Sequence, residues 1–327
     1  GEFDEKMLQA NINNFKLYEL QSMESNEGRA DIFVNSFING TNWEDEVTAI
    51  DRMAKLTKED IVAFADKYLK EDNYAVVYKK QGKDPNEKKM TKPEITPIVS
   101  NRDVASPFLT SIQENAVKPI EPVFLDFKKD MSQLTAKSDI PVLYKQNTTN
   151  DLFQLIYVFD MGNNNDKALG TAFDYLEYLG TSDMTPEELK SEFYRLACTF
   201  YVSPGNERTY VVLSGLNENM PAAMQLFEKL LADAQVNKEA YNNLVGDILK
   251  ARADAKLNQG QNFSRLMNYA MYGPKSPATN LLTEAELASM NPQELVDRIH
   301  NQNNYKHRIL YYGPSSSKDL LATIDQY

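Results

Sequence analysis

The stretch from Leu152 to Thr181 constrains the fold of this chain more than any other. Its first part, Leu152 to Asp160, is an apolar and aromatic run of strand length that closes on Met161-Gly162. Its second part, Ala168 to Leu179, places apolar residues at helical spacing and ends at Gly180-Thr181. The stretch therefore predicts a strand that leads directly into a helix with a buried face.

The segments around this stretch alternate between strands and helices. Further predicted strands cover residues 140–145, 200–204, 209–216 and 306–313. Predicted helices cover residues 185–198, 219–234, 238–258, 262–272, 284–290 and 292–300. The first of these helices begins with Thr185 as N-cap and Pro186 at its first position. Strand pairs that bracket long helices favour an α+β sandwich, with a mostly antiparallel sheet packed against helices, over a doubly wound sheet.

The first 80 residues predict part of a second unit. Residues 4–68 are helical in pattern, with a stop at Asn39-Gly40 and a capping-box pattern from Thr57 to Asp60. Tyr74 to Tyr78 follows as a predicted strand because it is β-branched and aromatic. The chain opens without Met and inside an apparent helix. We therefore expect a longer parent chain, of which residues 1–80 are the C-terminal part of a preceding domain.

Residues 81–138 are predicted to be an extended connector. The prolines that prevent helices from continuing are Pro93, Pro97, Pro107, Pro119 and Pro122. The apolar residues of the segment predict that it packs on the folded units rather than forming a free linker. These residues are Ile95, Ile98, Val99, Phe108, Leu109, Val123, Phe124 and Leu125. Residues 139–327 then form a complete domain.

The helix of the opening stretch carries a frame that reads Asp174-x-x-Glu177-Tyr178, followed by Gly180-Thr181. This arrangement resembles the H-x-x-E-H helix of the pitrilysin/insulinase family of zinc metallopeptidases, in which two histidines bind zinc beside a general-base glutamate. At pattern level the resemblance covers nearly the whole chain. Asp247, 69 residues beyond Tyr178, matches the position of the distant acidic zinc ligand. The resemblance implies a degenerate domain of this fold and a connector that either hinges two halves or only joins them.

Both histidines of the frame are missing in this chain. The implied ligands would be Asp174, Tyr178 and Asp247, with Glu177 as base, whereas zinc prefers histidine nitrogen or cysteine sulfur. We therefore predict no metal ligand and no catalytic residue here, and the resemblance implies zinc in a catalytic domain of the parent chain. The alternative for the helix is a structural role with Glu177 solvated or hydrogen-bonded. Its core residues would be Phe173, Tyr175, Leu176 and Leu179.

For the remaining residues that could react or bind ligands, the sequence context indicates structural roles rather than catalytic ones. The single cysteine, Cys198, is expected to be a small buried hydrophobe. The two histidines, His300 and His307, have no partner at helical spacing and are expected at the surface or at a strand edge. Trp43 is expected to anchor a loop or a helix start. The serine run after Gly313-Pro314 lacks the phosphate-loop pattern and predicts a serine N-cap.

Charge and hydropathy limit the classes of partner. The net charge of -12 disfavours nucleic acid, because binding to phosphates requires lysine and arginine. No apolar run approaches the ~20 residues that span a bilayer. The compartment stays open, with periplasm or cell envelope expected if the parent chain carries a signal peptide.

The resemblance implies a non-catalytic region that helps to enclose peptide substrate in a chamber while zinc hydrolysis occurs in another domain. Its partners would be peptide and the remaining domains of the parent chain. Candidate substrate-binding residues are Tyr210, Val212 and Ser214, on a predicted strand edge, and Glu177. Two alternatives stay open. One is a catalytically dead structural or assembly subunit of the same family, and the other is chelator-sensitive hydrolysis by this chain itself.

Overall fold

The computed structural model describes residues 4–72, 74–82, 88, 90–97 and 104–327. Their contacts divide the chain into two units, Gly1–Asp60 with Phe127–Tyr327, and Ile61–Asp126. Among the described residues, no helix has both the length and the apolar character needed to cross a membrane. The two units are described separately below.

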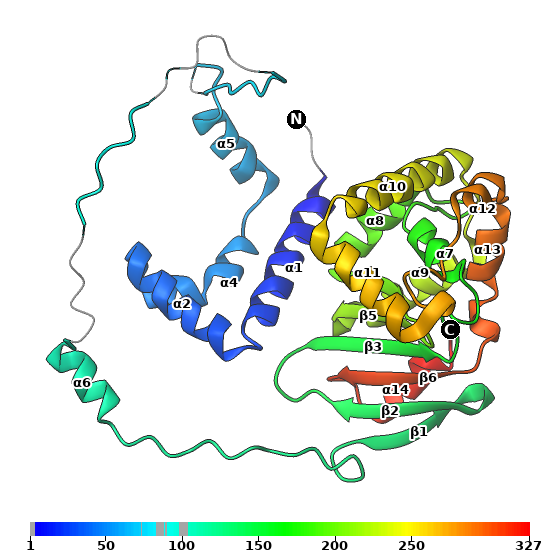
Figure 1. Ribbon diagram of the computed structural model, residues 1–327. Helices are drawn as coiled ribbons and strands as arrows, with labels where there is room; N and C mark the ends of the chain where they lie inside the picture. Colours follow the sequence, from blue (N-terminus) through cyan, green and yellow to red (C-terminus); the bar gives the residue numbers. More distant parts are fainter. Residues whose placement is uncertain (1–3, 73, 83–87, 89, 98–103) are drawn as a thin grey trace. The chain divides into compact units, whose positions relative to one another are not determined.

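A mixed sheet organises the first unit (Figure 1). Its strands are β1 (Ser132–Ala136), β2 (Ile140–Gln146), β3 (Leu152–Phe159), β4 (Cys198–Pro204), β5 (Thr209–Leu216) and β6 (His307–Gly313). They lie in the order β1-β2-β6-β3-β5-β4, and every neighbouring pair is antiparallel except β2 and β6. The edges are therefore β1 and β4. The α+β class and the mostly antiparallel sheet are confirmed.

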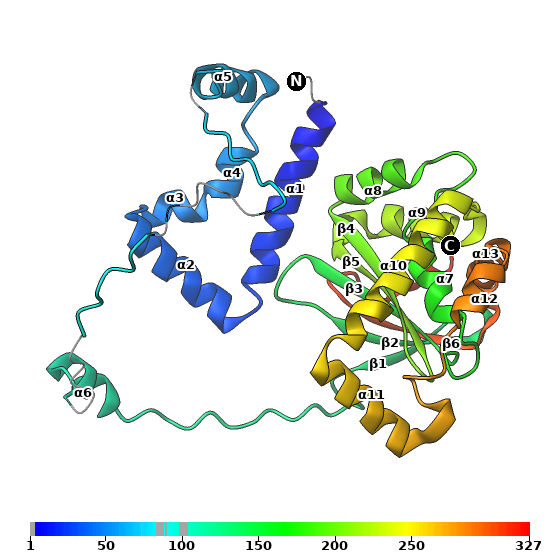
Figure 2. The ribbon, with the colours of Figure 1, turned by 45° about the horizontal axis from the view of Figure 1, so that its top comes forward.

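Helices of the same unit pack on one face of this sheet (Figures 1 and 2). They are α7 (Leu169–Leu176), α8 (Pro186–Arg195), α9 (Met220–Asp233), α10 (Lys238–Lys256), α12 (Glu284–Ser289), α13 (Gln293–His300) and α14 (Ser317–Ile324). Helix α11 (Gln259–Tyr272) follows α10 and has no buried residue. Local capping sets several of their starts. Thr185 and Thr283 form capping boxes, and Ser316 caps α14, as the serine run predicts.

Strand alternation decides which side chains reach the helices. Leu155, Tyr157 and Phe159 of β3 belong to the main buried cluster, together with Val211 and Leu213 of β5. The opposite side of the sheet, called the second face below, carries the residues between them. Strand register aligns one row across it, which consists of Tyr201, Val212, Ile156, Leu310 and Leu143.

Helix α1 (Glu5–Ser22) belongs to the first unit and packs against α8. The Asn14 side-chain nitrogen donates a hydrogen bond of 2.7 Å to the Tyr194 carbonyl oxygen. Tyr194 Oη in turn donates to Asn11 Oδ1 at 2.6 Å. A small buried cluster of Leu17 with Leu152, Ala197 and Leu216 adds apolar contact. These contacts attach α1 to α8 and to strands β3 and β5 of the same unit.

Three further helices follow α1 in this unit. They are α2 (Asn26–Asn39), α3 (Trp43–Val47) and α4 (Ala49–Met53). Gly40 ends α2 in the left-handed conformation with φ of 64°, as its sequence predicts. Trp43 begins α3 and stacks on Phe33 with ring centroids 4.6 Å apart, which confirms its anchoring role.

The second unit contains most of α5 (Lys58–Tyr68), capped by Thr57 as predicted, and α6 (Pro107–Gln113). The predicted strand from Tyr74 to Tyr78 is wrong, because these residues are extended but pair with no described strand. A strand needs a neighbour for its backbone hydrogen bonds, and composition alone cannot supply one.

The predicted packing of the connector on the folded units stays a prediction, because most of the connector belongs to the second unit. Val123 and Phe124 are exposed, and so are Ile95 and Phe108. Ile98 and Val99 lie outside the described residues. Strand β1 lies within the predicted connector, because its alternating polar residues give a weak apolar signal.

Candidate functional site

The Asp174-x-x-Glu177-Tyr178 frame lies at the C-terminal end of α7. The helix ends at Leu176, earlier than the predicted Leu179, and Glu177 is its C-cap. The chain turns here because Gly180 approaches Met184, whose carbonyl oxygen would lie 2.3 Å from a Cβ at position 180. Tyr178 therefore falls beyond the last regular turn of the helix.

The helix itself is a core element. Phe173, Tyr175, Leu176 and Leu179 are all buried, which confirms the structural expectation for these four residues. Tyr175 also has two hydrogen bonds to the backbone of Asn237, the N-cap of α10. The apolar side of the frame thus holds α7 between the sheet and its neighbouring helices.

The polar side of the frame is exposed. Partial burial, with a smaller effect of the Glu177 carboxylate, raises the pKa of Asp174. Asp247, on α10, is exposed as well. Among the described residues, no group of three or more histidine, cysteine, aspartate and glutamate side chains is arranged to hold a metal ion. Oxygen donors from Asp174, Tyr178 and Asp247 are also a poor match for zinc, so we assign no chemical step to a metal in this chain.

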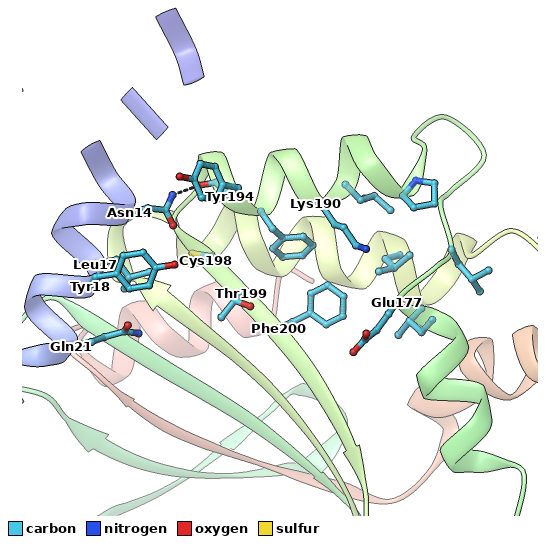
Figure 3. Close-up of a pocket in the computed structure, with 16 residues that line it drawn as sticks. Asn14, Leu17, Tyr18, Gln21, Glu177, Lys190, Tyr194, Cys198, Thr199 and Phe200 are labelled. Atoms are coloured by element: carbon cyan, nitrogen blue, oxygen red, sulfur yellow. Dashed lines mark hydrogen bonds between the residues drawn. The ribbon is translucent and has the colours of Figure 1, made fainter. Parts of the chain in front are cut away.

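A cavity of about 440 Å³ lies next to the frame (Figure 3). Its apolar wall is formed by α7, α8, α9 and β4, with Leu176, Leu179, Pro186, Leu189, Phe193, Phe200 and Leu230. Its polar rim includes Glu177 and Lys190, and α1 closes one end with Asn14, Tyr18 and Gln21. In Figure 3, Glu177 and Lys190 lie on the same side of the cavity as Phe200. Sequence reasoning identified Glu177 but missed the cavity, since its residues come from separate helices.

The other candidate substrate residues lie elsewhere. Tyr210, Val212 and Ser214 point to the second face of the sheet, because Val211 and Leu213 between them face the helices. The structure does not bring them together with Glu177, which lies on the helical side. The predicted strand edge at 210–215 is wrong, because β4 pairs with β5 along its length and leaves β5 inside the sheet.

The reactive side chains have structural surroundings. Cys198 is buried at the start of β4 rather than at a helix end, and burial raises the pKa of its thiol to about 12. His300 is exposed, as predicted. His307 differs from the prediction, since it is half-buried and packs against Phe159 with ring centroids 4.8 Å apart. Near it, burial raises the pKa of Glu228 despite opposing effects of Asn303 and His307.

Comparison with known proteins supports the fold assignment. No protein-family model matches the chain, and no curated protein matches its sequence. Among solved structures, a peptidase M16 inactive domain from Pseudomonas fluorescens is 15% identical with a TM-score of 0.52, over 60% of this chain and 50% of that chain. M16 is the peptidase family of pitrilysin and insulinase.

Two proteases match over nearly the full length of this chain. The periplasmic protease PqqL from Escherichia coli is 13% identical with a TM-score of 0.53, over 98% of this chain and 40% of that chain. The ferredoxin protease FusC, solved as a mutant in complex with Arabidopsis ferredoxin, is 10% identical with a TM-score of 0.53, over 100% and 39%. This chain therefore spans half or less of the length of these three structures. It has the fold of M16 peptidase domains, as the resemblance implied.

Proposed function

We propose that this chain is a non-catalytic region of an M16-type zinc peptidase, which helps to enclose peptide substrate while zinc hydrolysis takes place in another domain. One observation carries the proposal. The chain has the M16 domain fold, yet the helix frame at Asp174, Glu177 and Tyr178 offers no nitrogen or sulfur ligand. A domain that has this fold but lacks nitrogen and sulfur ligands for zinc is better suited to form part of the chamber wall than to be the active site.

The second face of the sheet supports a role in contact with peptide. Tyr201, Tyr210 and Tyr312 are 51%, 41% and 40% exposed; Tyr201 lies in the row that contains Val212, and the other two lie in the rows on either side of it. Tyrosine combines a large apolar ring with a hydrogen-bonding hydroxyl, which suits contacts with varied peptide sequences. We propose Tyr210 and Ser214 as wall residues on this face, whereas the third candidate, Val212, is only 3% exposed.

The N-terminal region supports the proposed domain order. Tyr74 to Tyr78 is extended and unpaired among the described residues, and Phe37 and Ile38 on α2 are 87% and 71% exposed. Apolar surface of this extent is expected where a further structural element packs. We propose that residues 1–80 are the C-terminal part of a preceding domain and that residues 139–327 form the degenerate domain. Residues 81–138 would connect the two domains.

A second candidate is a structural or assembly subunit. Helix α11 favours it, because none of its residues is buried and Phe263, Leu266 and Met271 are about 60% exposed. An exposed apolar helix face of this kind is typical of a protein–protein interface. The two candidates differ in whether the chain binds free peptide.

Peptide binding and cleavage by the purified chain test the proposal. We expect fluorescein-labelled, unstructured peptides to bind in an anisotropy titration, and we expect Tyr210→Ala to weaken that binding. We also expect no cleavage of fluorogenic peptides, with or without added zinc. Chelator-sensitive cleavage with stoichiometric zinc by metal analysis would overturn the non-catalytic assignment. Failure to bind any peptide would favour the assembly subunit.

A further inference from the structure

Helix α11, which follows α10 at the surface of the first unit (Figures 1 and 2), presents its apolar face to solvent. The exposed apolar residues recur at i, i+3, i+4, i+7 and i+8, which is the spacing of one helix face. They are Phe263, Leu266, Met267, Ala270 and Met271. An apolar face that points outward is expected where a further surface covers it.

The polar side of α11 faces the first unit. Arg265 is half-buried, and its Nη2 lies 3.5 Å from the Ala278 carbonyl oxygen. At the turn between α10 and α11, the Asn262 side chain donates a hydrogen bond of 2.7 Å to the Lys256 carbonyl oxygen, and Asn258 caps the helix. These bonds help to fix the rotation of α11 about its axis, with the apolar side outward.

A groove of about 740 Å³ runs between α10 and α11. Arg252 of α10 and Arg265 of α11 both line it, and none of the described residues that line it is acidic. Arg252 Nη1 donates a hydrogen bond of 2.8 Å to the Leu282 carbonyl oxygen. Among the described residues, neither arginine forms an ion pair. Most of their guanidinium donors are therefore available to a carboxylate from another molecule.

The charge of this part of the chain is opposite to that of the whole. Residues 248–283 contain five lysines and arginines and one aspartate, whereas the net charge of the chain is -12. A basic surface on an acidic protein attracts acidic partners, and the acidic remainder of the chain disfavours an anionic bilayer. Ala251, Ala255 and Gly260 also line the groove, and their small size leaves the arginines accessible.

We propose that the face formed by α10 and α11 binds an acidic amphipathic helix of a partner protein. Apolar side chains of the partner would pack on Phe263, Leu266 and Met267. A carboxylate beside them would enter the groove and pair with Arg252 and Arg265, which adds selectivity for acidic helices. The proposal rests on the second candidate function only in taking α11 to be an interface.

A pair of probe peptides tests this chemistry on the unaltered protein. The acidic probe is a fluorescein-labelled peptide of about 18 residues, with leucine along one helix face, glutamate on both flanks of that face and alanine elsewhere. The neutral probe has glutamine in place of every glutamate. In anisotropy titrations we expect the acidic probe to bind about tenfold more tightly, with an advantage that shrinks as salt screens the charges. Equal affinities for the two probes would overturn the proposal.

Truncation of the apolar face locates the site. Leu266→Ala removes an exposed side chain, so the fold should be unaffected, and we expect binding of the acidic probe to weaken about tenfold. Val236→Ala, at an exposed position in the loop before α10, is the matched control and should leave binding unchanged. Equal effects of these two variants would place the probe elsewhere and overturn the α11 site.

Arg252→Gln tests the pairing with a carboxylate. It should weaken binding of the acidic probe about tenfold and leave binding of the neutral probe unchanged, because only the acidic probe has carboxylates. Lys238→Gln, an exposed charge about 21 Å along α10, is the matched control. Circular dichroism checks the folding of both variants, and the probe pair decides if Arg252→Gln is unfolded. Equal weakening of both probes would contradict the pairing.

The outcomes separate this inference from the proposed function. The acidic probe should bind Tyr210→Ala as it binds the wild type, and unstructured peptides should bind Leu266→Ala as they bind the wild type. Loss of acidic-probe binding in Tyr210→Ala but not in Leu266→Ala would overturn the α11 site and retain the proposed function. Binding of the acidic probe without binding of unstructured peptides would support the α11 site and overturn the chamber wall.

Two other occupants of this face would also overturn the proposal. Vesicles of phosphatidylcholine with about one quarter phosphatidylglycerol that sediment with the wild type but not with Leu266→Ala would assign the face to a membrane surface. A dimer in sedimentation equilibrium that Leu266→Ala abolishes would assign it to a second copy of the chain.

Discussion

Tyr175 Oη donates a hydrogen bond of 2.6 Å to the Asn237 carbonyl oxygen and accepts one of 2.8 Å from the Asn237 amide nitrogen. A single side chain on α7 thus satisfies both backbone groups of the residue that caps α10. The Tyr175 ring also meets Tyr241 of α10 edge-on, with ring centroids 5.8 Å apart. The helix that carries the Asp174-x-x-Glu177-Tyr178 frame therefore has a structural role, because it connects the core to the start of α10.

Tyr175→Phe should lower the free energy of unfolding by about 0.5–1.5 kcal/mol, because it removes two part-buried hydrogen bonds to the Asn237 backbone, whose carbonyl oxygen still accepts from the Tyr241 amide. Urea unfolding followed by circular dichroism measures the change. Tyr178→Phe, at the exposed end of the same helix, is the matched control and should change stability by less than about 0.5 kcal/mol. Equal effects of the two variants would contradict the structural role of Tyr175.

Gln302→Met should stabilise the protein or leave its stability unchanged. Gln302 is completely buried, and neither its side-chain nitrogen nor its side-chain oxygen has a hydrogen-bond partner among the described residues. A buried amide without partners costs about 1–3 kcal/mol, which methionine of similar length avoids. Thermal unfolding of both proteins measures the difference. A loss of more than about 1 kcal/mol would show that the amide has a favourable role.

Glu228→Gln should change how stability depends on pH. Burial raises the pKa of Glu228, so the folded protein holds this proton more tightly than the unfolded chain. The wild type therefore carries a penalty above the raised pKa, and the penalty disappears as the pH falls below the ordinary glutamate pKa. The variant should be the more stable protein at pH 7, with the difference shrinking towards pH 4.

Urea unfolding at both pH values measures that difference for Glu228. Glu207→Gln, in the exposed turn between β4 and β5, serves as the control and should show little pH-dependent difference. His307 lies close enough to Glu228 to lower the pKa of that carboxyl, so the comparison is repeated in a His307→Gln background. A difference for Glu228→Gln that grows towards low pH would reverse the predicted sign.

Cys198 should react slowly with thiol reagents in the native protein. Its thiol is buried and its pKa is raised to about 12, so the reactive thiolate is scarce at pH 8. Native labelling with a chromogenic disulfide should be at least about 100-fold slower than labelling of the urea-unfolded chain. Because this is the only cysteine, a single rate describes each state. Comparable rates would place Cys198 at the surface.

Local sequence signals predicted much of the first unit correctly. Apolar runs located β3 and β5, and helical periodicity located α9 and α10, because residues within one element determine these patterns. Capping residues such as Thr185 satisfied nearby backbone donors, as predicted. The Asp174-x-x-Glu177-Tyr178 frame could be recognised from the sequence for the same reason, because its residues are neighbours in the chain.

Pairing between distant segments could not be predicted in this way. Sequence patterns placed Tyr210 on an edge strand. In the tertiary structure β4 pairs with β5, so β4 is the edge strand and Tyr210 lies inside the sheet. Sequence patterns also predicted a strand at Tyr74–Tyr78, which finds no partner among the described residues.

The sequence by itself determined most of the elements, the apolar faces of the helices and the absence of histidine at Asp174 and Tyr178, because local residue types suffice for these. Only the tertiary structure decided which strand is an edge, where α7 ends and which helices enclose the cavity beside Glu177. Strand order and cavity walls depend on contacts between residues far apart in the chain. Hydrophobic periodicity reports only which face of each element is buried, so it cannot predict these contacts.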